Sequence, residues 1–173
     1  MAVHDPTRIK LLVFDVDGVF TDGRIYLDAK GNESKAFHTH DGFGIRVAHE
    51  AGLKTAVLSA RTAGAVEHRM KHLGVDYVTQ GMDHKGDGIQ RVQNASSIHP
   101  LDMAYLGDDI LDIAAMTRVG YPMAVANAAE ETKAHAAYVT QRQGGHGAIR
   151  EAIEHVMRAQ GTWASTVAKY IER

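Results

Sequence analysis

The chain contains no cysteine, which excludes disulfides and thiolate metal sites. No apolar run approaches the roughly 18 residues of a membrane span, and residues 1–10 lack the apolar core of a signal peptide. The formal net charge is only −2, which argues against nucleic acid or an anionic membrane surface as a partner. We therefore expect a cytoplasmic protein with no nucleic-acid partner and no membrane partner.

The 173 residues are enough for one domain with a substantial core, and we expect a domain over 1–160 followed by a C-terminal tail over 161–173. Short apolar runs alternate with helical stretches. The runs that predict strands are Ile9–Phe14, Thr55–Leu58, Tyr77–Val78, Met103–Leu106, Pro122–Val125 and Tyr138–Val139. The stretches that predict helices are Gly44–Ala51, Ala63–Leu73, Lys85–Asn94, Ile110–Val119, Glu130–Ala136 and Ala148–Ala159. This order predicts an α/β fold, with a Rossmann-like parallel sheet and helices on both faces.

One segment interrupts this alternation. Residues Gly23–His38 contain two short alternating runs around a turn-rich centre, which predicts a small β-hairpin after the first strand. Ligands of such sheets bind beyond the carboxyl ends of the strands. We therefore expect the hairpin to stand as a flap beside Asp15 and Asp17, which follow the first strand.

The acid pair Asp15 and Asp17 follows four apolar residues and precedes Gly18, which permits a sharp turn. Two carboxylates at the end of a buried strand are costly unless a cation compensates them. A hard divalent cation such as Mg²⁺ accepts oxygen ligands and keeps positions for water and phosphate. An ordinary acidic turn is the alternative interpretation of this motif taken alone.

The later strand ends also carry polar groups. Ser59 follows the second predicted strand, Lys85 the third, and Asp108 and Asp109 the fourth, with Asp112 one turn further. Each has an ordinary alternative: a helix cap for the serine and the acids, a solvated surface charge for the lysine. Together, acids, hydroxyl and lysine at successive strand ends predict a site for a metal ion and a phosphate.

These motifs resemble the haloacid dehalogenase superfamily, in its phosphatase branch, from about Ile9 to Arg150. More specifically, the 3-deoxy-D-manno-octulosonate 8-phosphate phosphatase family resembles this chain at Thr21-Asp22-Gly23, at residues 40–46, at Ser59-Ala60-Arg61 and at residues 144–151. The resemblance implies no large cap domain, a homotetramer whose sites are completed by neighbouring subunits, and a role in lipopolysaccharide biosynthesis. Ala60 and His146 depart from commoner family forms, which have glycine and arginine there.

The resemblance also implies a reaction. Asp15 becomes a transient aspartyl phosphate, and Asp17 protonates the departing oxygen before serving as base for water. Mg²⁺ is held by Asp15, Asp108 and the backbone carbonyl of Asp17, while Ser59 and Lys85 hold phosphate oxygens. Asp109 and Asp112 are expected to hydrogen-bond metal-bound water.

The implied substrate is a small phosphorylated sugar acid, whose carboxylate suits arginine. The resemblance places substrate contacts at Asp17, His38, Thr39, His40, Asp41, Gly42, Arg46, Arg61, Arg69 and Lys85. Arg46 and Arg69 have a solvated helix face as their ordinary alternative. Phosphatases of nine-carbon sugar acids resemble this pattern but tend to carry an acid at position 61, so Arg61 favours the octulosonate.

The residues Gly144–Gly147 are either a flexible lead into the next helix or, with the tail, part of a neighbouring subunit's site. Trp163 and Tyr170 are then expected to be contact residues between subunits rather than core residues. Two other classes stay open: a phospho-accepting, receiver-like regulatory domain and a catalytically silent scaffold. The position of the acid pair on the first strand disfavours the former, and the complete set of polar groups disfavours the latter.

Overall fold

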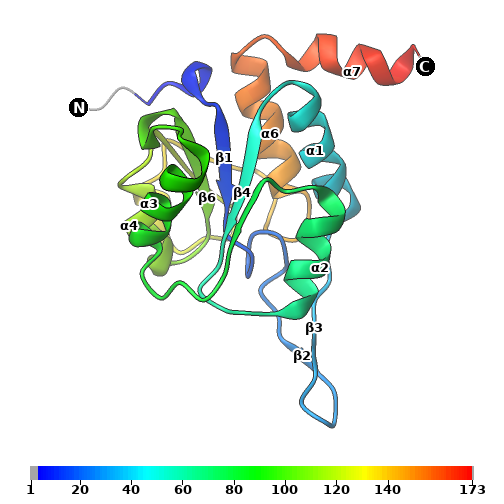
Figure 1. The fold of residues 1–173 in the computed structure, drawn as a ribbon, viewed down its shortest axis with the longest axis vertical. Coiled ribbons are helices and arrows are strands. Elements are labelled where there is room, and N and C mark those ends of the chain that lie inside the picture. The colour runs from blue at the N-terminus through cyan, green and yellow to red at the C-terminus, as the bar shows by residue number, and fades with distance from the viewer. Residues whose placement is uncertain (1–3, 173) are drawn as a thin grey trace.

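The structure, a computed structural model, describes residues 4–172, so residues 1–3 of the predicted domain and residue 173 of the predicted tail lie outside it. A six-stranded parallel sheet in the order β5-β4-β1-β6-β7-β8 forms its centre (Figure 1). The strands are β1 (Leu11–Phe14), β4 (Lys54–Leu58), β5 (Tyr77–Thr79), β6 (Met103–Gly107), β7 (Tyr121–Ala124) and β8 (Tyr138–Val139). The predicted parallel sheet is therefore confirmed, and β1 lies between β4 and β6.

Helices cover both faces of the sheet (Figure 1). The α-helices are α1 (Thr39–Glu50), α2 (Gly64–Leu73), α3 (Lys85–Ser96), α4 (Ile113–Met116), α5 (Glu130–Ala134), α6 (Ala148–Ala159) and α7 (Trp163–Ile171). The described part of the chain also contains the short 3₁₀ helices η1 (Pro6–Arg8), η2 (Pro100–Asp102) and η3 (Ile110–Asp112). Side chains of a strand alternate between its faces, so Leu12 and Phe14 pack with α1 and α6, whereas Leu11 and Val13 pack with α3 and α4.

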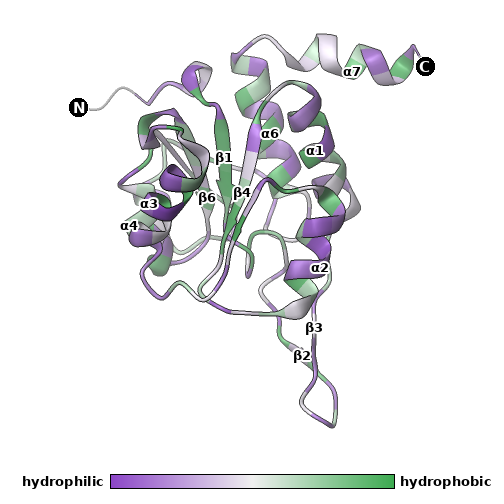
Figure 2. Ribbon diagram, in the orientation of Figure 1, coloured by the Kyte–Doolittle hydropathy of each residue, from purple (hydrophilic) through white to green (hydrophobic). Residues whose placement is uncertain are grey.

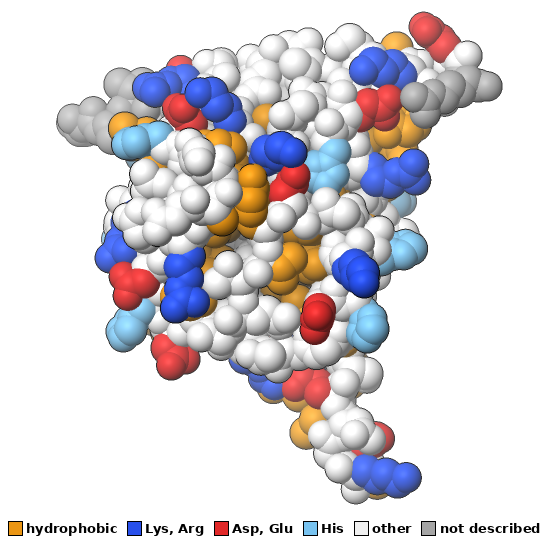
Figure 3. Space-filling model, viewed as in Figure 1, with side chains coloured by type: hydrophobic (Ala, Val, Ile, Leu, Met, Phe, Trp, Pro, Cys, Tyr) orange, Lys and Arg blue, Asp and Glu red, His pale blue; other side chains and the backbone are white. Residues whose placement is uncertain are grey.

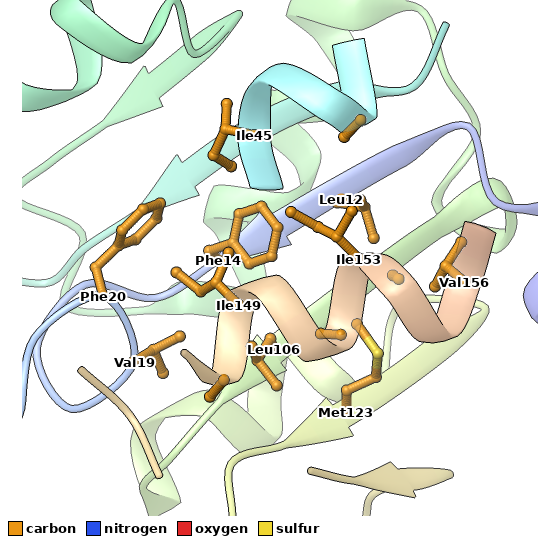
Figure 4. Packing of buried hydrophobic residues seen from close by; sticks show 14 of the residues in the cluster. Leu12, Phe14, Val19, Phe20, Ile45, Leu106, Met123, Ile149, Ile153 and Val156 are labelled. Carbon is orange, nitrogen blue, oxygen red and sulfur yellow. The ribbon is translucent and has the colours of Figure 1, made fainter. Parts of the chain in front are cut away.

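The larger core lies between the sheet and α6 (Figure 4). Ile149, Ile153 and Val156 recur along one side of α6 and are fully buried, which is the spacing of an amphipathic helix. Phe14 meets Phe20 edge to face, with ring centroids 5.7 Å apart. Figure 2 shows the apolar residues gathered along the central strands and the inner sides of the helices, while polar residues occupy the outer sides.

Within residues 4–172, the hairpin interrupts the alternation of strands and helices. Its strands β2 (Tyr26–Leu27) and β3 (Glu33–Ser34) pair antiparallel and project from the carboxyl end of the sheet (Figure 1). No large cap domain is present in residues 4–172, as predicted. Acidic and basic side chains are interspersed over the face drawn in Figure 3, from which the hairpin stands clear. Within the described residues, no helix is both long and apolar enough to cross a membrane.

Helix α1 begins at Thr39, five residues before the predicted start, because packing overrides the low helix propensity of glycine. A Cβ at Gly42 would lie 2.5 Å from Nη2 of Arg69, and one at Gly44 would lie 3.1 Å from Cδ of Arg150. Both glycines therefore allow α1 to approach its neighbours closely. The predicted helix 110–119 is shorter than expected and is divided into η3 and α4.

The expectation that Trp163 lies outside the core is wrong. Residues 163–171 form α7, and the Trp163 side chain is buried in the larger core of its own chain. Guanidinium carbons of Arg150 and Arg158 lie 4.8 Å and 5.3 Å from its ring centroid, so the indole is enclosed by cation–π contacts. Tyr170 is half-buried against Phe43 of α1, with ring centroids 5.0 Å apart. The domain boundary at residue 160 stays a prediction.

Candidate active site

The carboxyl edge of the sheet carries a cavity of about 180 Å³. Phe14 pairs with Val57 on one side and Leu106 on the other, so the segments after β1, β4 and β6 emerge side by side. The cavity is lined by Asp15, Asp17, Ser59, Ala60, Arg61, Lys85, Asp108, Asp109 and Leu111. Polar residues predicted from separate strand ends therefore do meet in one cavity.

Lys85 lies at the centre of the cavity's charge network. Its ammonium, on a side chain that is 4% exposed, is 2.7 Å from Oδ1 of Asp15 and 2.6 Å from Oδ1 of Asp112. The Tyr105 hydroxyl donates to the same Asp112 oxygen at 2.7 Å. The second Asp112 oxygen accepts the backbone N–H groups of Asp108 and Asp109. Fully buried Asp112 thus fixes both the lysine and the turn that carries Asp108.

Negative charge exceeds positive charge in this network. Carboxylate oxygens of Asp15, Asp108 and Asp112 all lie within 4.8 Å of one another. Burial raises the pKa of Asp15 to about 7; the charge of Asp112 adds to this shift, and Lys85 opposes it. Burial, followed by the charges of Asp15 and Asp112, raises the pKa of Asp108 to about 8. A divalent cation with oxygen ligands would relieve this repulsion, so the side chains fit such an ion.

The turn after β1 is held by close backbone packing. The N–H groups of Gly18 and Gly23 donate to the buried hydroxyl of Thr21. Gly144, in the loop before α6, packs against the Gly18 peptide, where a Cβ would lie 2.5 Å from the carbonyl carbon. The Gly145 N–H donates to the Val19 carbonyl at 2.9 Å. The glycine loop is therefore ordered against the turn that carries the acid pair.

Ser59 and Arg61 occupy the adjoining strand end. Ser59 is buried, and its hydroxyl donates to the Arg61 carbonyl at 3.1 Å. The exposed Arg61 guanidinium forms an ion pair with Glu33 of the hairpin. The cavity consequently offers a hydroxyl, a buried ammonium and a guanidinium to an anionic ligand.

Not all predicted substrate residues reach this cavity. Those outside its lining are His38, Thr39, His40, Asp41, Gly42, Arg46 and Arg69, and their substrate role stays a prediction. Asp41 is buried, and its Oδ1 accepts the Arg150 N–H at 2.8 Å, so it caps α6. Burial raises its pKa. His38 and His146 line a second hollow of about 270 Å³ beside the hairpin.

Three residues of the site were not predicted. Glu33 and Lys35 belong to the hairpin arm and form ion pairs with Arg61 and Asp17, respectively. Glu33, Lys35 and Phe37 are every second residue of one segment, so in an extended strand their side chains share a face. This spacing could have indicated that the two charged residues face the site. Tyr105 lies in an apolar strand, where a buried hydroxyl demands a hydrogen-bond partner.

Comparisons with known proteins agree with this geometry. A family model described as haloacid dehalogenase-like hydrolase matches residues 77–153. The 3-deoxy-D-manno-octulosonate 8-phosphate phosphatase KdsC of Escherichia coli K12 is 40% identical over 154 residues, 89% of this chain and 82% of that protein. The Yersinia pestis protein of the same name is 38% identical over 158 residues, 91% of this chain and 84% of that protein.

Solved structures agree as well. The 3-deoxy-D-manno-octulosonate 8-phosphate phosphatase of Moraxella catarrhalis, in complex with magnesium, phosphate and KDO, has a TM-score of 0.92 at 34% identity, covering 95% of each chain. A probable YrbI-family phosphatase of Pseudomonas syringae has a TM-score of 0.94 at 42% identity, covering 97% of this chain and 96% of that one. These matches favour a phosphatase over a receiver-like domain or a silent scaffold.

Proposed function

We propose, because this chain belongs to the 3-deoxy-D-manno-octulosonate 8-phosphate phosphatase family of haloacid dehalogenase-like hydrolases, that it hydrolyses that sugar acid phosphate to the free sugar acid and phosphate. The observation that carries the proposal is the cavity in which Asp15, Ser59, Lys85 and Asp108 meet. The product would serve lipopolysaccharide biosynthesis in the cytoplasm. Assembly into a homotetramer with shared sites belongs to the same proposal, and sedimentation velocity tests it.

The reaction has two steps. In the first, a carboxylate oxygen of Asp15 attacks phosphorus, the bond from phosphorus to the sugar oxygen breaks, and Asp17 gives that oxygen its proton. The sugar acid leaves, and an aspartyl phosphate remains. In the second, water attacks phosphorus, the Asp17 carboxylate takes a proton from it, and the bond from Asp15 to phosphorus breaks. Inorganic phosphate is released and both side chains are restored.

Positive charge must accompany the phosphate into this acidic cavity. Lys85, 2.7 Å from the Asp15 carboxylate, is placed to bind a phosphate oxygen during transfer, and Ser59 contributes a hydroxyl. Mg²⁺ would be held by Asp15, Asp108 and the backbone carbonyl of Asp17, and supplies charge that offsets repulsion between nucleophile and phosphate. Asp112 positions Lys85 and the turn of Asp108 through its hydrogen bonds.

Arg61 is proposed to bind the carboxylate of the sugar acid. Its guanidinium already pairs with a carboxylate, that of Glu33, at the mouth of the cavity. A planar guanidinium binds a carboxylate through two parallel hydrogen bonds, and a simple hexose phosphate has no carboxylate. A nine-carbon sugar acid phosphate is the alternative substrate because it carries the same two anionic groups.

A substrate panel tests the proposal. Octulosonate 8-phosphate, a nonulosonate phosphate and simple hexose phosphates are each assayed with and without Mg²⁺. We expect phosphate release chiefly from the octulosonate and only with the metal. The Asp15→Asn variant is the matched control, since it keeps the shape of the side chain and removes the nucleophile. Near-normal turnover by that variant would contradict the assignment of Asp15 as the nucleophile. A preference for the nonulosonate phosphate would show that the nine-carbon sugar acid phosphate, and not the octulosonate, is the substrate.

A further inference from the structure

The returning arm of the hairpin presents one face to the body of the molecule. Along residues 33–37, Glu33, Lys35 and Phe37 are partly shielded, whereas the two residues between them are exposed. This is the period of an extended strand, whose alternate side chains share a face. The Phe37 ring meets Phe20 edge to face at 6.5 Å and thereby anchors the arm to the core. The same register directs the charged side chains toward the active site.

Lys35 is the most deeply enclosed charge of this arm. Only 1% of its side chain is exposed, and its ammonium forms an ion pair with Oδ1 of Asp17. It lies 2.7 Å from Oε1 of Glu33, whose second oxygen pairs with Arg61. A continuous chain of ion pairs thus runs from Asp17 through the hairpin to Arg61. It joins the ends of two different core strands, β1 and β4.

Such an arrangement fixes the side chain that it contacts. Glu33 is one partner of this enclosed ammonium and Asp17 is the other, so rotamers of Asp17 that break the pair cost the lysine one of its two ion pairs. Proton transfer requires a donor held within hydrogen-bond reach of the accepting oxygen, and small misplacements lower the rate steeply. The pair engages Oδ1 and leaves Oδ2 to carry the proton.

We propose that Lys35 is a positioning residue of the phosphatase reaction, which holds Asp17 from the hairpin so that its second oxygen faces the departing sugar oxygen. The inference rests on the acid role proposed for Asp17. The proton moves from Oδ2 of Asp17 to the ester oxygen as that oxygen keeps the electron pair of the breaking bond to phosphorus. Lys35 itself exchanges no proton and touches no reacting atom.

Leaving groups of different basicity separate this role from a structural one. A sugar alkoxide needs a proton as it departs, whereas 4-nitrophenolate is stable as an anion and needs none. The value of kcat/KM reports the steps up to departure of the leaving group. We expect Lys35→Met to lower kcat/KM for the sugar acid phosphate at least about tenfold more than for 4-nitrophenyl phosphate, since general acids contribute about a hundredfold or more.

Two further variants complete the comparison. Lys35→Arg keeps a cation at the same place and should restore most of the lost kcat/KM toward the sugar acid phosphate. Lys30→Met removes an exposed lysine of the same hairpin and should leave both substrates unchanged. Thermal unfolding of each variant verifies that the fold persists.

The outcomes distinguish this inference from the proposed function. Equal losses on both substrates, or no loss, would overturn the positioning role of Lys35 while leaving the phosphatase assignment intact. Asp17→Asn provides the reference, because removing the acid itself should produce the largest difference between the two leaving groups. If Asp17→Asn shows no such difference, the acid role of Asp17 fails and the role of Lys35 fails with it.

Discussion

Gly18 lies directly against the carboxylate of Asp108. A Cβ at Gly18 would stand 2.5 Å from Cγ of Asp108, and the glycine has a φ of +90°. The turn that follows β1 and the carboxylate that follows β6 therefore occupy adjoining space. A side chain at position 18 would collide with the Asp108 carboxylate, so the glycine permits this close approach.

Gly18→Ala should displace Asp108 and weaken binding of the divalent cation. We expect activity to fall about 10- to 100-fold or more, with a higher Mg²⁺ concentration needed for half-maximal rate. Gly52→Ala is the matched control, because Gly52 has a φ of +86° and a Cβ placed there would meet no other atom within 4 Å. It should lose about 1 kcal/mol of stability and keep its activity. Equal activity of the two variants would contradict this account.

The metal-free protein should become less stable as pH rises from about 5 to about 8. Asp15 and Asp108 have pKa values raised to about 7 and about 8, so the folded state holds protons that the unfolded state has already lost. Raising the pH removes those protons and lowers the free energy of unfolding. Calorimetric unfolding across this range, with and without saturating Mg²⁺, measures the effect, and the metal should abolish the decline.

The Asp108→Asn variant is the control for this pH dependence. It removes one of the two carboxyl groups whose pKa is raised, and it relieves the charge repulsion on Asp15. The stability of this variant should therefore vary less over the same pH range. If the free energy of unfolding of this variant falls as steeply with pH as that of the unchanged protein, Asp15 and Asp108 are not the groups responsible.

Trp163→Ala should destabilise the domain rather than disturb only an intersubunit contact. The indole is 8% exposed and packs in the larger core, so its loss should cost about 3 kcal/mol in the free energy of unfolding. Ile171→Ala, at a side chain that is 79% exposed on the same helix, should change it by less than about 0.5 kcal/mol. Urea unfolding measures both, and similar values would contradict the burial of Trp163.

Arg61→Glu should act on substrate selectivity. The charge reversal removes the group proposed to bind the substrate carboxylate and places a like charge beside Glu33. We expect KM for octulosonate 8-phosphate to rise about tenfold or more, with a smaller change for 4-nitrophenyl phosphate. Arg91→Glu makes the same charge change at an exposed position of α3 and should leave both values unaltered. Equal losses on both substrates would contradict a selectivity role.

Much of the cavity was predictable because its residues follow apolar strands. The apolar runs before Asp15, Ser59 and Asp108 predict buried parallel strands, and the carboxyl ends of parallel strands lie at the same edge of a sheet. The roles of Asp112 and Tyr105 were less accessible, since the sequence does not show that the Asp112 carboxylate turns inward and accepts from both Lys85 and the Tyr105 hydroxyl. A carboxylate that is buried must find hydrogen-bond partners, and whether it is buried depends on the helices and strands packed around it.

The amino-acid sequence by itself determined the alternation of strands and helices, the insertion of the hairpin, and the set of acids, hydroxyl and lysine at the strand ends. These follow from local hydrophobic periodicity and from residue chemistry. Only the tertiary structure decided that α1 extends through Gly42 and Gly44, that Trp163 is buried, and that Lys35 reaches Asp17. Each of these depends on contacts between segments far apart in the chain, and local sequence patterns do not specify which distant segments come into contact.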